Sequence, residues 1–229
     1  MVISIASVFL CYHYNINFKV DLTLLSIAII FPLVFTIRGS FRRREKALEH
    51  LSQYRSAMKT LHYFITTSTL LDEEEVSLKL LLENIEDKTI LHLKSHEGSI
   101  KNLDEEVDKV YGFIHSRRET ISKSLKDKLF KYMCALHEAI DNLNGIHVHR
   151  TPVSLKAYCK VFIYIFPLIY APTIIFNIGE TYNHFTVYFV VILTEFILIS
   201  LYNIQDDLEY PFDDKGLDDI QLDHFKVLR

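Results

Sequence analysis

Apolar and charged residues are separated along this 229-residue chain. The apolar residues concentrate in residues 1–38 and 155–203, whereas the charged residues crowd into 41–150 and 204–229. A single water-soluble domain mixes the two kinds over short distances, because each of its helices has one buried and one solvated side. The separation is typical of lipid-facing segments joined to an aqueous part. It predicts an all-α, helical membrane protein.

Four apolar runs are candidate transmembrane segments. They are Met1–Tyr14, Leu22–Ile37, Ala157–Ile178 and Phe185–Tyr202. The first is short, because at about 1.5 Å per residue it does not cover a hydrocarbon core about 30 Å thick. We therefore divide the chain into two membrane segments in residues 1–38, a cytosolic helical domain in 39–154, two further segments in 155–203 and an acidic cytosolic tail in 204–229.

The orientation follows from a basic cluster directly after the second apolar run. It contains Arg38, Arg42, Arg43, Arg44 and Lys46. Basic residues next to a span gather on the cytoplasmic side. The segment joining the last two runs has no Lys or Arg and is expected outside, so the protein is expected to be a multi-pass protein of the cell membrane.

The cytosolic part reads as helix almost throughout. Apolar residues recur at three- and four-residue spacing in 48–65, 76–85, 100–114 and 121–143, as in amphipathic helices. The first stripe continues directly from the second apolar run. Asp72, followed by three Glu residues, is expected to cap the second of these helices. Gly98, Gly112 and Gly145 fall at or near the breaks, although Gly112 is also placed for an interior kink.

Composition narrows the function further. A net charge of −4 provides no basic field for nucleic acid. The three Cys are odd in number and two lie in apolar runs, so no disulfide is expected. His147 and His149 could ligate a metal only from an extended segment, and no acid or thiol adjoins them. Because no phosphate loop, nucleophile elbow or HExxH is present, we expect neither an enzyme nor a cofactor.

Ile27, Phe31 and Phe35 follow one another at four-residue steps in the second run, which aligns them along a helix. They are either a packing or lipid-facing ridge, or a pore-lining stripe. In the second case, several copies around an axis form apolar rings that gate by dewetting. Phe edges carry partial positive charge and tolerate anions better than cations. Pro32 lies in the middle of the same apolar run and frees a backbone carbonyl that needs a partner.

Two acidic features also need an explanation. Glu195 is costly inside a membrane if ionised, so we expect it to face protein or water, either on a pathway or as a neutral hydrogen-bonded carboxyl. The tail holds eight acidic residues around a turn at Pro211 and another at Gly216. Its spacing differs from that of an EF-hand. We expect an acidic strap that docks on basic residues such as Arg42 to Arg44.

At these residues the sequence resembles the bestrophin family of pentameric anion channels, including its bacterial members. The Ile27, Phe31, Phe35 stripe resembles the family's hydrophobic neck, which has an Ile and two Phe at the same steps. SFRRREKALEHL resembles the stretch where the pore helix leaves the membrane. LYNIQDDLEYPFDDKGLDDI resembles the acidic Pro-Phe segment after the last span. The likeness covers residues 21–220 in the same order.

The resemblance implies a homopentamer in which five copies of the second segment surround an axis and conduct chloride or similar monovalent anions passively. In calcium-activated animal members an acidic cluster after Pro-Phe forms a calcium clasp. Its nearest equivalents here are Asp214, Asp218 and Asp219, but Lys215 interrupts the run and Asp213 replaces the usual Gly. The sequence therefore argues against calcium gating.

Two other classes stay open on the sequence. One is a non-conducting helical membrane protein whose cytosolic domain recruits partners. The other is a transporter that uses Glu195 as a proton-coupled carboxylate. Four segments without an inverted repeat argue against the transporter.

We predict that a cysteine introduced at Lys101 is not labelled by an impermeant thiol reagent added outside intact cells, because residues 41–150 are cytoplasmic. Labelling after permeabilisation serves as the control. Strong labelling of intact cells would reverse the orientation.

Overall fold

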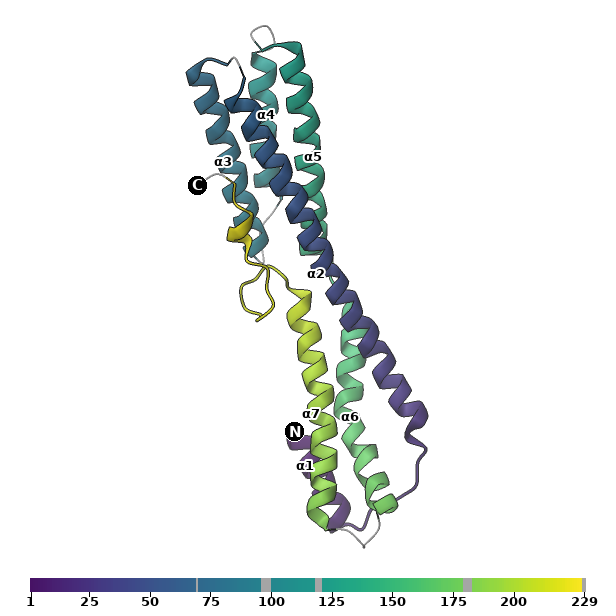
Figure 1. Cartoon of the computed structure of the whole chain (residues 1–229). Coiled ribbons are helices and arrows are strands. Elements are labelled where there is room, and N and C mark those ends of the chain that lie inside the picture. The colour runs from purple at the N-terminus through teal and green to yellow at the C-terminus, as the bar shows by residue number, and fades with distance from the viewer. Residues whose placement is uncertain (69, 96–99, 118–120, 179–182, 228–229) are drawn as a thin grey trace. The chain divides into compact units, whose positions relative to one another are not determined.

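The computed structural model describes residues 1–68, 70–95, 100–117, 121–178 and 183–227, and its regular elements in these ranges are all helices. Figure 1 shows them in chain order. They are α1 (Val2–His13), α2 (Leu22–Thr66), α3 (Asp72–Lys94), α4 (Lys101–Ser116), α5 (Lys123–Val148), α6 (Val153–Ile178), α7 (His184–Glu209) and the short 3-10 helix η2 (Leu222–Phe225). The predicted all-α class is confirmed.

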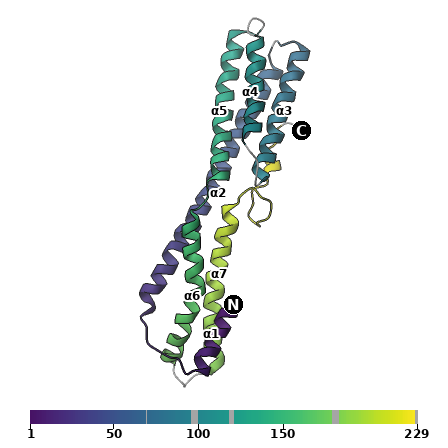
Figure 2. The same cartoon turned by 180° about the vertical axis from the view of Figure 1, so that it is seen from behind.

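The chain forms two compact units, which we describe separately. The membrane unit comprises Met1–Arg42 and Thr151–Glu209, and the bundle unit comprises Arg43–Arg150 and Tyr210–Arg229. Helix α2 begins in the first unit and ends in the second, and it is unbroken in both views (Figures 1 and 2). The expectation that the first cytosolic stripe continues the second apolar run is therefore confirmed.

Three helical stretches of the described residues are long and apolar enough to cross a membrane. They are Leu22–Thr66, Lys123–Ile178, whose apolar part is α6, and His184–Glu209. The remaining predicted segment is α1, an apolar helix of 12 residues that is shorter than the other three stretches. Val8 and Cys11 of α1 pack with Ala171 of α6 and with Val187 and Val191 of α7. The segment between α6 and α7 was predicted to lie on the extracellular side. It includes residues 179–182, which are not among the described residues.

The bundle unit has one hydrophobic core formed by α2 to α5 and the tail. The tail contributes Phe212, Ile220 and Leu222, so it is anchored on the bundle by apolar side chains. One local expectation needs correction. Asp72 is the first helical residue of α3 and Leu71 is its N-cap, so the four acids act through the helix dipole and not as a cap. Gly112 is interior to α4, which was one of its two expected positions, Gly145 lies in the last turn of α5, and Gly98 is outside the described residues.

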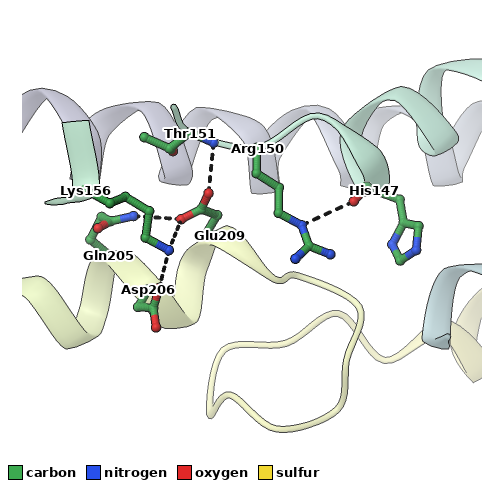
Figure 3. A network of polar contacts seen from close by, with 7 residues as sticks. All are labelled: His147, Arg150, Thr151, Lys156, Gln205, Asp206 and Glu209. Atoms are coloured by element: carbon green, nitrogen blue, oxygen red, sulfur yellow. Dashed lines mark hydrogen bonds and ion pairs between the residues drawn. The ribbon is translucent and has the colours of Figure 1, made fainter. Parts of the chain in front are cut away.

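A polar network holds the start of α6 to the end of α7 within the membrane unit (Figure 3). The buried carboxylate of Glu209 accepts hydrogen bonds from the Thr151 backbone N–H at 2.8 Å and from Gln205 Nε2 at 3.0 Å. Lys156 Nζ lies 2.9 Å from Glu209 Oε2 and also pairs with Asp206. These contacts stabilise the last turns of α7, which ends at Glu209. Residues 204–209, which were predicted to belong to the tail, are helical.

We predict that Phe212→Ala loosens the tail, because Phe212 is only 2% exposed in the bundle core. Such a truncation costs about 3–5 kcal/mol. Limited proteolysis followed by mass spectrometry should then cut after residue 209 much faster. The matched control is Leu217→Ala in the same tail, where the side chain is fully exposed. Equal cleavage of the two variants would contradict the anchoring role.

Candidate functional site

Within the membrane unit, one face of α2 packs against the rest of the unit. Ile29 and Leu33 are 2% and 1% exposed and share a cluster with Cys159, Ile163 and Phe166 of α6 and Leu198 of α7. Thr36 and Ser40 are buried on the same side of the helix. This contact fixes how α2 is rotated about its axis.

The predicted neck residues lie on the opposite face. Ile27, Phe31 and Phe35 are 52%, 61% and 56% exposed, and the Phe31 and Phe35 rings meet edge to face with centroids 5.0 Å apart. None of the three belongs to the buried clusters of the described residues. Their large side chains are therefore available to lipid or to another copy of the chain.

Pro32 has no N–H, so the carbonyl of Ala28, four residues earlier, loses its helical partner. The hydroxyl of Tyr158 on α6 donates to that carbonyl oxygen at 3.2 Å. A side chain from the neighbouring helix thus replaces the missing bond. This hydrogen bond attaches α2 to α6 and leaves the stripe of Ile27, Phe31 and Phe35 uncovered.

Glu195 is completely buried on α7, beside the start of α1. Its Oε2 lies 3.1 Å from the Met1 backbone nitrogen, while neither carboxylate oxygen has a hydrogen-bond partner among the described residues. Helices α1 and α7 run antiparallel, because Tyr12 contacts His184 and Val8 packs near Val191. Glu195 therefore faces protein, and it is on a different helix from the stripe of Ile27, Phe31 and Phe35.

The tail residues Pro211 to Ile220 form a loop that closes on itself in the bundle unit. The Ile220 N–H donates to the carbonyl of Pro211 at 2.8 Å, and the Gly216 N–H donates to Asp219 Oδ2 at 2.8 Å. A Cβ on Gly216 would lie 2.6 Å from an oxygen of Asp219. The loop therefore has room only for glycine at this position unless the carboxylate moves.

The three acids proposed as a clasp have separate roles. Asp214 pairs with Lys94 at 2.7 Å, Asp219 binds the Gly216 N–H, and Asp218 uses its backbone carbonyl to accept from Arg44 Nε at 2.7 Å. The expected docking on the basic cluster thus occurs at Arg44, through a main-chain oxygen. Among the residues that the structure describes, no group of three His, Cys, Asp or Glu side chains is placed to hold a metal.

Burial raises the pKa of the Asp219 carboxyl above its ordinary value, and the neighbouring Asp213 carboxylate raises it further. Asp213 and Asp219 therefore interact within the loop. Sequence position gave Asp214, Asp218 and Asp219 and did not include Asp213. The structure differs because the loop folds back at Gly216 and brings its two ends together.

His147 has a different neighbour from the one that its sequence suggested. It lies in the last turn of α5, where the chain is helical and not extended, so His149 does not share a ligand geometry with it. Its ring instead meets that of His92 at 5.4 Å, and His92 Nε2 is 2.9 Å from Asn144 Oδ1. Because His92 and His147 are far apart in the sequence, this contact between α3 and α5 could not be predicted from it.

The bundle unit also has a groove that the sequence analysis missed. It has a volume of about 620 Å³ and lies between α4 and α5. Apolar and aromatic residues line it, with acids at its side: Val107, Asp108, Tyr111, Ile114, Phe130, Met133, Cys134, His137, Glu138, Asp141 and Asn142. Tyr111 and Phe130, which are about half exposed, are the residues that could have indicated this groove in the sequence.

Comparison of sequences finds no matching family model and no matching curated protein. Comparison of structures does find similar proteins. A bacterial bestrophin homologue from Klebsiella pneumoniae superposes with a TM-score of 0.80 at 16% identity, covering 98% of this chain and 90% of that chain. The chain has the bestrophin fold.

Two mutated forms of the same Klebsiella pneumoniae homologue give TM-scores of 0.79, at 16% and 15% identity. Both alignments cover 98% of this chain, with 91% and 92% of those chains. The bestrophin-like resemblance noted from the sequence is confirmed by this fold. The chain thus has the fold of these structures, and three of its described helical stretches are long and apolar enough to cross a membrane.

We predict that Glu195→Gln assembles normally, whereas Glu195→Lys does not, because a lysine in a spanning helix costs about 2.5–3.5 kcal/mol and here has no aqueous exit. Expression yield and size-exclusion chromatography in detergent measure assembly. Asp207→Lys is the matched control, since Asp207 is exposed on the same helix. Normal assembly of Glu195→Lys would place residue 195 near water or headgroups.

Proposed function

We propose that this chain is one subunit of a bestrophin-like channel that conducts monovalent anions such as chloride passively through the cell membrane. The observation that carries the proposal is the uncovered stripe of Ile27, Phe31 and Phe35 on α2. The fold makes the proposal specific, because the structures that this chain resembles are those of a bestrophin homologue.

The stripe fits a narrow apolar neck. Each turn of α2 contributes one large side chain on the same line, so copies arranged around an axis would stack three apolar rings. A constriction of this kind excludes water when it is narrow and conducts when it widens. The edges of the Phe31 and Phe35 rings carry partial positive charge, which favours a passing anion over a cation.

Five copies are proposed, by analogy with the family. Self-association would remove exposed apolar side chains of α2 from lipid and water, and the opposite face, held by Ile29 and Leu33, would keep each stripe aimed at the axis. Conduction of this kind needs neither a catalytic group nor a cofactor. Chloride enters the proposal as the permeant ion, and no role is assigned to calcium.

The competing class is a non-conducting membrane protein whose bundle unit recruits partners. The groove between α4 and α5 is the observation that favours it, because aromatic residues line a concave surface there. A groove of this size is compatible with channel function as well. Only the neck stripe separates the two classes, so the test concerns α2.

We predict that replacing Ile27, Phe31 and Phe35 together with Ala leaves the oligomer intact and increases anion flux or abolishes its gating. The side chains are exposed within each subunit, so removing them leaves no cavity in the described core. Chloride efflux from liposomes, measured alongside the native mass of the purified protein, tests both parts.

The matched control is triple alanine replacement of Phe189, Leu193 and Phe196, which are exposed apolar residues on α7. This variant removes a similar volume and should conduct like the wild type. An intact oligomer whose flux is the same in all three proteins would leave the stripe without a pore role. Absence of flux in the wild type would favour the non-conducting class.

A further inference from the structure

The stripe of α2 does not end with Phe35. At about 100° per residue, Arg38 and Arg42 each lie within about 20° of the direction of Phe31. Residues seven apart on a helix nearly coincide in direction, and these pairs are Phe31 with Arg38 and Phe35 with Arg42. The apolar line therefore continues into two consecutive cationic side chains.

Packing supports this alignment independently of ideal helix geometry. Leu33, Thr36 and Ser40 are buried on the opposite side of the same helix, whereas Arg38 and Arg42 are exposed. The buried side thus stays in phase as far as Ser40. The two arginines must then share the uncovered side with the neck residues.

The basic cluster at the end of the apolar run is divided by the structure. Arg44 donates to the carbonyl of Asp218, and Lys46 pairs with Glu49 at 2.6 Å. Neither Arg38 nor Arg42 forms a hydrogen bond or an ion pair with another described residue. Of the five basic residues, Arg43, Arg44 and Lys46 therefore take part in contacts, and Arg38 and Arg42 remain available to solutes.

We propose that Arg38 and Arg42 form the anion-selecting mouth of the pore, one to two helical turns to the cytosolic side of the apolar neck. This inference rests on the proposed function, because it requires α2 to line the axis. It assigns the larger part of the choice of anion over cation to these two guanidinium groups, beyond the preference that the Phe edges of the neck already give.

The physical basis is a fixed charge in water next to a dry constriction. Guanidinium groups stay protonated at every physiological pH. Copies of both arginines around one axis raise the local concentration of anions and lower that of cations. Because both side chains are solvated, they attract an anion weakly enough for it to leave, as conduction requires. The neck then decides whether ions pass, and the mouth decides which ions arrive.

Glu45 provides a test of sign, since it follows Arg42 by three residues on α2 and is exposed. A carboxylate there opposes the arginines. Removing its charge should change selectivity in the opposite direction. A purely structural role of the arginines predicts no such reversal.

The experiment measures the chloride-to-potassium permeability ratio from reversal potentials in planar bilayers under a KCl gradient. Arg38→Gln with Arg42→Gln should lower the ratio by about fivefold or more, as expected for a loss on the order of 1 kcal/mol per ion near a solvated charge. Glu45→Gln should raise the ratio. Lys160→Gln is the matched control, because Lys160 is an exposed cation on α6, and it should leave the ratio unchanged.

A second arm replaces Arg42 with Cys in a Cys134→Ser background, since Cys134 is the exposed native thiol. A cationic thiol reagent should restore the ratio and an anionic one should lower it further. This arm needs only a channel that folds with one substitution on the stripe.

The outcomes are separable. A conducting channel whose permeability ratio is the same in all variants overturns this inference and leaves the proposed function standing. A change that appears only in bilayers containing anionic lipid also overturns it, because the arginines would then bind headgroup phosphates. A wild-type protein that forms no conducting oligomer refutes the proposed function itself.

Discussion

The packing of Ile29 and Leu33 against α6 and α7 is the constraint on which the proposed pore-lining role of α2 depends. A helix buried on one side has only one side left for other tasks. By placing Ile29 and Leu33 on the packed face, the sequence leaves Phe31, Phe35 and two arginines on the free face. The hydroxyl of Tyr158 on α6 reinforces this packing, because it donates to the carbonyl of Ala28 on α2, which Pro32 leaves without a helical partner.

The bundle unit is stabilised differently, through a hydrophobic core that includes the end of the chain. Phe212 and Leu222 enter that core, while Asp214 bonds to Lys94 and Asp219 bonds to the loop backbone. The tail is therefore a packed part of the bundle, and its docking on Arg44 uses a main-chain oxygen.

Much of the fold could be predicted from hydrophobic periodicity, because amphipathic stripes such as Leu103 to Ile114 report which side of a helix is buried. The same logic aligned Ile27, Phe31 and Phe35. It could not say which side of α2 packs, since both sides of a membrane helix are apolar and only contacts with Cys159 and Ile163 decide it.

Contacts between residues far apart in sequence were beyond the reach of periodicity. The pairing of Asp214 with Lys94 and the meeting of His92 with His147 depend on how α3 lies beside the tail and α5. The family resemblance gave Asp214, Asp218 and Asp219 as the nearest equivalents of a calcium clasp, by their place after Pro-Phe, although Lys215 argued against calcium. Their distinct partners became visible only in three dimensions. Glu195 differs, since the cost of a charge in lipid already required that it face protein or water.

The tight approach of Gly216 to Asp219 has an evolutionary consequence. A side chain at position 216 would displace the Asp219 carboxylate and so break the bond that closes the turn, whereas a smaller residue at position 219 removes that bond and the close approach together. The glycine is therefore needed only while position 219 keeps its carboxylate in this bond. Related chains should therefore vary at these two sites in concert, and a lineage that loses the acid becomes free to lose the glycine.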